Sequence, residues 1–101
     1  MSDVNKVEIS GRLTKDALMK HTPGGKTVTE LHLAVNDEAS TIFVQVDCWG
    51  DEAGEIVGEL EKGRRVVIFG RLKQILTGRG TRNAKKRLII ASDYILLVED
   101  F

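Results

Sequence analysis

The period of the apolar residues changes twice along this chain, and this constrains the fold more than any other feature. Apolar and polar residues first alternate with period two, as expected for half-buried strands. These runs cover residues 7–13, 29–35 and 42–49. Asp51 to Lys62 then places apolar residues three and four positions apart, which predicts a short amphipathic helix. Strand character returns at residues 65–75 and 88–98.

Turn signals separate the predicted elements. Leu18 to His21 continues the first strand after a break, and the Pro- and Gly-containing segment Thr22 to Lys26 predicts a tight turn. Thr77 to Lys86 is predicted to be a Gly- and Arg-containing loop before the last strand. Five strands with one helix between the third and fourth is the order of the OB fold, an all-β Greek-key barrel. A βαβ unit with a parallel sheet is the competitor, but it needs several helices.

Composition is typical of one globular domain over residues 1–101. Hydrophobic residues make up 42% of the chain, too many for a disordered segment, and no apolar run approaches membrane-spanning length. Cys48 is the only cysteine, so neither an intramolecular disulfide nor a thiolate zinc site can form. Its place in an alternating run predicts a small buried hydrophobe. A reduced, cytoplasmic location follows as the expectation.

Charge is strongly segregated, although the formal net charge is zero. Residues 27–61 contain nine Asp or Glu and no Lys or Arg, whereas residues 62–87 contain ten Lys or Arg and no acid. Clustered basic residues mark a face for polyanions. Arg71 and Lys73 share a strand face with Val67 and Phe69, and further basic residues gather in the predicted loop. The loop candidates are Arg79, Arg82, Lys85 and Lys86. The alternative is an ordinary solvated loop.

Two aromatic residues are predicted to point outward. Phe43 and Trp49 lie on one face of the third strand, opposite the aliphatic face that begins at Ile42. Outward aromatics on a barrel are stacking platforms in proteins that bind single strands. The alternatives are that Trp49 covers the barrel's end or that Phe43 seals a subunit interface.

Catalysis has little support in the sequence. His21 and His32 are isolated, and Asp37 and Glu38 would point to opposite faces of a strand, so no metal site or cofactor is expected. The glycine segments Gly24-Gly25 and Gly78-Arg79-Gly80 do not lie between a predicted strand and a predicted helix, as a phosphate-binding loop does. The basic residues show no helical motif for the major groove. We therefore expect a protein that is not an enzyme.

Several segments, in order, resemble the bacterial-type single-stranded DNA-binding protein family over about nine tenths of the chain. They are Val4–Val7, Gly11–Asp16, Gly25–Asn36, Phe43–Gly50 and Lys62–Leu72. The resemblance implies an OB fold, sequence-tolerant single-strand binding and a homo-oligomer, usually a tetramer. By resemblance, Phe43 and Trp49 match base-stacking positions, and Lys6 and Lys73 match positions that contact the backbone. Arg12, inside a matched segment, joins the candidates.

The chain also departs from the family pattern. It lacks the aromatics that the family places after Asn36 and after Leu72, and Asp47 sits between the two aromatics on the presumed DNA face. It ends at Glu99-Asp100-Phe101 without the usual long linker and acidic tail. The sequence therefore predicts single-stranded DNA binding in replication, recombination or repair, with RNA left open and replication or recombination proteins as further partners. The rival is a primosome-type module that binds protein through its aromatic face.

Overall fold

The computed structural model describes residues 2–78 and 80–99 of the 101-residue chain. Within these ranges it contains six strands, one short α-helix and one 3-10 turn. In chain order they are β1 (Val7–Leu13), β2 (Leu18–His21), β3 (Thr27–Asn36), β4 (Thr41–Trp49), α1 (Glu52–Glu55), the 3-10 turn η1 (Val57–Glu59), β5 (Arg65–Thr77) and β6 (Lys85–Leu97).

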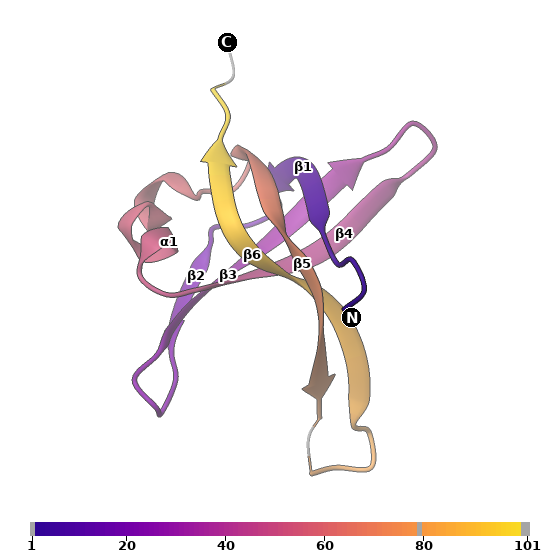
Figure 1. Ribbon diagram of the computed structural model, residues 1–101. Helices are drawn as coiled ribbons and strands as arrows, with labels where there is room; N and C mark the ends of the chain where they lie inside the picture. Colours follow the sequence, from indigo (N-terminus) through magenta and orange to yellow (C-terminus); the bar gives the residue numbers. More distant parts are fainter. Residues whose placement is uncertain (1, 79, 100–101) are drawn as a thin grey trace.

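The strands form one sheet that closes into a barrel (Figure 1). Their order is β1-β5-β6-β4-β3-β2, and β1 also pairs with β3 through Arg12 and Leu13. Only β4 and β6 run parallel among the described strands, through Val46–Ile90 and the next pair. This is the OB fold that the sequence predicts, with α1 and η1 between the third and fourth barrel strands. The predominance of antiparallel pairs excludes the βαβ competitor.

The sixth strand arises because the first barrel strand is interrupted. Its two parts, β1 and β2, pair with the same strand, β3. The flanking register pairs are Leu13 with Leu33 and Leu18 with Glu30. Between them the chain leaves the ladder, and the amide of Ala17 donates to the Leu60 carbonyl oxygen at 2.8 Å. The predicted continuation of the first strand after a break is therefore confirmed.

The core is made by the inward residues of the alternating strands. Its members with at most 2% exposure are Leu13, Leu31, Leu33, Val46, Leu60, Val66, Ile68 and Ile90. Cys48 is buried as predicted, and burial raises the pKa of its thiol to about 11. Ile42, predicted to share this inward face, is exposed instead. It lies near the start of β4, where the β3–β4 hairpin extends beyond the barrel (Figure 1).

The predicted helix from Asp51 to Lys62 is wrong in length. Only Glu52–Glu55 is α-helical, and Ile56, with φ −110° and ψ 9°, interrupts the helix before the 3-10 turn. Gly54 and Gly58 lower the helix propensity by about 1 kcal/mol each relative to Ala, so the short segment stays helical only where Ala53 packs into the core. No helix in the described ranges is long and apolar enough to cross a membrane.

The β5–β6 hairpin is longer than predicted and projects from the barrel as an arm (Figure 1). Pairing continues outward to Thr77 opposite Lys85, so Lys85 and Lys86 belong to β6 rather than to a loop. The sequence missed this because Lys and Arg are uncommon strand formers, while cross-strand hydrogen bonds hold them here. We use "the arm" for residues 72–88.

Candidate nucleic-acid interface

Phe43 and Trp49 point away from the core, as predicted. Phe43 is 73% exposed and Trp49 is 46% exposed, whereas Val46 between them is buried. The two aromatics are six residues apart on β4, which is roughly 20 Å at about 3.3 Å per residue. They are therefore two separate platforms on the outward face of β4, which also carries Gln45 and Asp47.

Trp49 is paired with a basic residue from another strand. The Lys73 ammonium nitrogen lies 5.6 Å from the centroid of the Trp49 ring, within range of a cation–π interaction. Lys73 belongs to β5 and opposes Ile89 of β6, and β6 in turn pairs with β4. The fold thus brings together two candidates that are separated by 24 positions in the sequence.

Arg71 lies on the same face as Lys73 but has an acidic partner. Its Nη1 lies 3.1 Å from Oδ1 of Asp93, and both side chains are more than half exposed. Asp93 is the extra residue of a bulge in β6, where the register shifts after Phe69. Such bulges redirect side chains, and this one directs a carboxylate to the basic face. The sequence shows the alternation of β5 but carries no signal for the bulge.

The N-terminal segment is fixed beside Arg71. The side chain of Asn5 accepts a hydrogen bond from the amide of Leu72 and donates one to its carbonyl oxygen, each at 2.9 Å. Val7 opposes Gly70 in the first register pair of β1 and β5. Lys6 lies between these two contacts and is therefore held next to Arg71 at the edge of β5, on the basic face. Asn5, which fixes it there, was not singled out in the sequence.

Arg12 is engaged elsewhere. The register places it beside Ala34, which is itself opposite Phe43, on the outward face. Its guanidinium nevertheless donates to the carbonyl oxygen of Gly63 at 3.0 Å. Arg12 therefore links β1 to the turn before β5, and this contact stabilises the fold.

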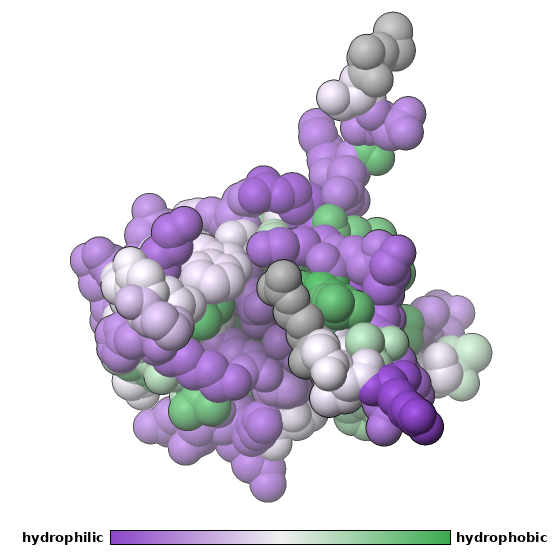
Figure 2. All heavy atoms as spheres, turned by 90° about the horizontal axis from the view of Figure 1, so that it is seen from below, coloured by the Kyte–Doolittle hydropathy of each residue, from purple (hydrophilic) through white to green (hydrophobic). Residues whose placement is uncertain are grey.

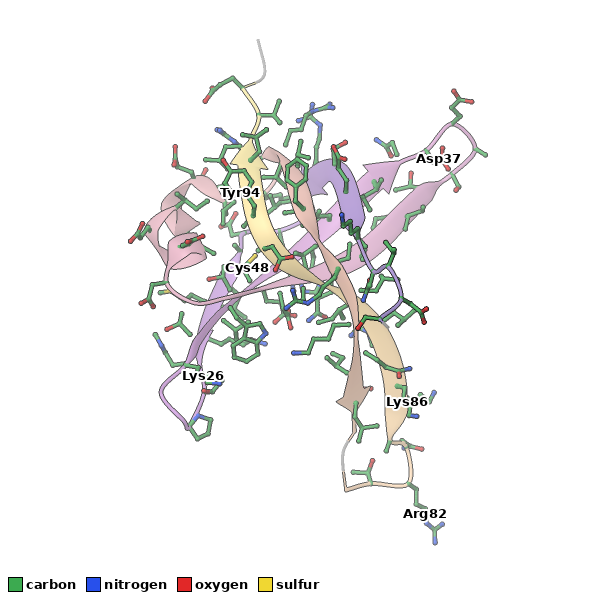
Figure 3. All side chains as sticks on the ribbon, in the orientation of Figure 1. Lys26, Asp37, Cys48, Arg82, Lys86 and Tyr94 are labelled. Atoms are coloured by element: carbon green, nitrogen blue, oxygen red, sulfur yellow. The ribbon has the colours of Figure 1, made fainter. Side chains whose placement is uncertain are left out.

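The arm divides its basic residues between two faces. Lys85 opposes Thr77 and Arg87 opposes Ile75, so both lie on the face that carries Lys73. Lys86 opposes Leu76 and points to the other face. Arg82 lies at the tip (Figure 3), and Arg79 falls outside the described residues.

Arg87 is a neighbour of Phe43 that sequence reasoning counted in the basic run but did not select. Both residues line one surface pocket, together with Gln45 of β4. The alternation of the strand indicates this position. Because β6 begins at Lys85, Arg87 lies two residues before Ile89 and on the same face of the strand. Viewed from the tip of the arm, this side of the molecule is mainly hydrophilic, with small hydrophobic areas between (Figure 2).

Acidic residues occupy the other half of the same face. Glu30 of β3 opposes Asp47 of β4. Glu30 binds Lys20 at 2.6 Å and His32 at 2.9 Å, and the hydrogen bond from Lys20 holds the pKa of Glu30 below its usual value. Asp47 accepts a hydrogen bond from Gln45 at 3.0 Å. The face thus carries the carboxylates of Asp47 and of Glu30, the latter paired with Lys20, on β3 and β4, and basic residues on β5, the arm and the N-terminal segment.

The two histidines have ordinary structural contacts. His32 bonds to Glu30, and the Nδ1 of His21 lies 3.2 Å from the hydroxyl oxygen of Thr27. Within the described ranges, no three His, Cys, Asp or Glu side chains gather in a way that could hold a metal ion.

The closed Greek-key barrel defines an OB-fold protein, and the outward aromatics beside basic residues match the composition of single-strand binding faces. The chain belongs to the single-strand binding protein family, whose model matches residues 4–97.

Curated proteins that are similar to this chain are named single-stranded DNA-binding proteins. A single-stranded DNA-binding protein of Thermus thermophilus is 42% identical over 74 residues, covering 68% of this chain and 28% of that protein. One from Treponema pallidum is 34% identical over 83 residues, covering 73% of this chain and 47% of that protein. The chain therefore spans less than half the length of these two curated relatives.

Two solved structures share the fold. The crystal structure of a deletion mutant of the Thermus aquaticus single-stranded DNA-binding protein has a TM-score of 0.78 and 32% identity, covering 97% of this chain and 43% of that one. A Plasmodium falciparum SSB in complex with ssDNA has a TM-score of 0.83 and covers 98% of both chains. At 20% identity, the second supports the fold alone.

Proposed function

We propose that this chain is a non-catalytic protein that binds single-stranded DNA with little sequence preference. Family membership supports this proposal, and the observation that carries it is the pairing of Trp49 with Lys73 on the outward face of the barrel. An indole that is half exposed can stack on a base, while an adjacent ammonium can meet the neighbouring phosphate. Stacking tolerates all four bases because every base has a π-face.

The charge division of the face orients the strand. Phosphates would follow the basic side, formed by Lys6, Arg71 and the arm with Lys73, because Asp47 repels them on the other side, where Glu30 is already paired with Lys20. The bases would then lie toward β4, where Phe43 and Trp49 offer their rings. The arm would supply the first electrostatic attraction, and stacking would follow.

Fluorescence titration tests the proposal directly, since Trp49 is the single tryptophan. Adding dT oligomers should quench the indole emission, because a stacked base replaces solvent on the ring. If about five basic side chains meet phosphates, log K should fall with log salt with a slope of about −3.5, at about −0.7 per contact. Asp47→Asn should tighten binding at low salt by removing a like charge.

Weak binding without a quench would refute the proposal. It would favour the rival function, a primosome-type module whose exposed aromatics contact another protein. A matched RNA oligomer belongs in the same titration, because stacking does not read the 2′-hydroxyl. In the cell, we propose that the protein protects exposed strands during replication, recombination and repair in the cytoplasm.

We also propose that the protein self-associates, as a tetramer built from dimers. The supporting feature is β1, which pairs with β3 only through Arg12 and Leu13, so that one edge of residues 7–11 has no partner among the described strands. Unpaired edges favour pairing with another chain. Beside it, the outward faces of β5 and β6 expose Tyr94 and Leu96, with Phe69 6.0 Å from Tyr94 between ring centroids. Sedimentation as a monomer at micromolar concentration would refute this proposal.

A further inference from the structure

The pocket that Phe43 shares with Arg87 is lined by side chains that can donate hydrogen bonds. It has a volume of about 150 Å³, and its polar lining residues are Thr14, His32, Gln45 and Arg87. No Asp or Glu is among the described residues that line it. The Arg87 guanidinium makes no hydrogen bond or ion pair with the described part of the chain. A pocket with donors, an available guanidinium and no carboxylate in its wall suits an anion.

His32 is the lining residue that can gain a charge near neutral pH. It lies on the outward face of β3, opposite Gln45 of β4, and its side chain is 30% exposed. Its Nε2 lies 2.9 Å from Oε1 of Glu30. An ionised carboxylate only accepts hydrogen bonds, so Nε2 carries the hydrogen and a second proton binds at Nδ1. Since Nδ1 has no hydrogen-bond partner among the described residues, the imidazolium has one donor left for a ligand.

The charged groups around His32 come from five strands. They are Arg12 of β1, Lys20 of β2, Glu30 of β3, Asp47 of β4 and Arg87 of β6. Glu30 favours the imidazolium, and the hydrogen bond from Lys20 holds the pKa of Glu30 below its usual value, so this carboxylate stays ionised in mildly acidic solution. Arg87 opposes a second positive charge in the free protein. A phosphate bound in the pocket would reverse this effect, because it attracts both cations.

We propose that His32 and Arg87 form a phosphate site on the outward face of the barrel, and that His32 contacts the phosphate as an imidazolium. Strand binding is then coupled to proton uptake. Because the phosphate favours the charged form of the imidazole, the affinity for a single strand rises as the pH falls through the range in which histidine titrates. This inference rests on the proposed single-strand binding and adds to it one contact that forms only when His32 is protonated.

The test measures the Trp49 fluorescence while a dT oligomer of about 16 nucleotides, enough to fill one OB fold, is added. Titrations at about pH 8 and about pH 5.5 lie on either side of the ordinary histidine pKa, and neither thymine nor the phosphodiester titrates between them. One more phosphate contact should steepen the slope of log K against log salt by about 0.7. At roughly 0.1 M salt, with about 1 M as the reference, the wild type should bind about fivefold more tightly at the lower pH. His32→Gln should abolish both changes, and His32→Lys should bind at about pH 8 as tightly as the wild type does at about pH 5.5.

His21→Gln is the matched control, because it removes the other histidine of the chain. His21 opposes Thr27, one step from the outward pair of Lys20 and Val28, so it lies on the opposite face and the gain in affinity at low pH should persist. Any effect of the α-amino group is common to all variants.

Equal wild-type affinity at the two pH values, or a gain that survives His32→Gln, would overturn the phosphate site while leaving single-strand binding intact. A gain without a steeper salt slope would assign His32 a purely structural role and would also overturn the site. Failure to bind dT at either pH would overturn the proposed function and this inference with it.

Discussion

The register of the β5–β6 hairpin predicts that neighbouring basic residues contribute unequally to strand binding. Arg87 lies on the arm face that carries Lys73 and lines a pocket with Phe43, whereas Lys86 points to the opposite face beside Leu76. Both residues are exposed, and both carry one positive charge. Arg87→Gln and Lys86→Gln therefore form a pair in which each variant removes one positive charge, from opposite faces of the arm.

The expected magnitude follows from counterion release. Each phosphate contact on a single strand contributes about −0.7 to the slope of log K against log salt. Losing one contact should therefore flatten the slope by about 0.7 and weaken binding about fivefold at roughly 0.1 M salt, taking about 1 M as the reference. Arg87→Gln should show this change. Lys86→Gln should leave the slope nearly unchanged, apart from a small long-range effect.

Titration of a dT oligomer at several salt concentrations measures both quantities from the Trp49 fluorescence. Adding Lys85→Gln to Arg87→Gln should double the change in slope, because Lys85 shares the face with Arg87. Equal losses for Arg87→Gln and Lys86→Gln would refute the assignment of faces. An unchanged slope in all three variants would show that the arm is merely solvated.

Three further predictions concern stability and stacking. Trp49→Ala should weaken dT binding by about 1–3 kcal/mol, the range for one stacked base; a loss of unfolding free energy near the ~3–5 kcal/mol of buried aromatic truncations would instead identify a core residue. Gly70→Ala should destabilise the fold by at least about 1–3 kcal/mol in urea unfolding, because a Cβ there would overlap the carbonyl oxygen of Ala91. Gly58→Ala, which meets no atom within 4 Å, is the control, and an equal loss there would contradict the reasoning. For Cys48, the folded-state pKa is raised to about 11, so the neutral thiol is favoured in the fold and stability is lost as pH rises from the unfolded value toward that pKa. This contribution should fall by about 1 kcal/mol between about pH 8 and about pH 10, and a wild-type pH dependence equal to that of Cys48→Ala would contradict it.

The sequence was sufficient wherever one face of a strand is buried along its length. The period of two assigned Val46 and Cys48 to the core and Trp49 to the surface, and each assignment is confirmed. It failed where the chain leaves the barrel. Ile42 is exposed because the β3–β4 hairpin runs past the core, and Lys85 is in a strand because backbone pairing continues without a core beneath it.

Local pattern thus determined the OB fold, the outward direction of the aromatics and the segregation of charge, because each depends on residues close together in the sequence. Only the tertiary structure decided which charges meet. It placed Lys73 over Trp49, turned Arg12 to Gly63 and, through a bulge, brought Asp93 to Arg71. These contacts join distant strands, and their geometry depends on register and barrel closure, which a single sequence does not encode in any local period.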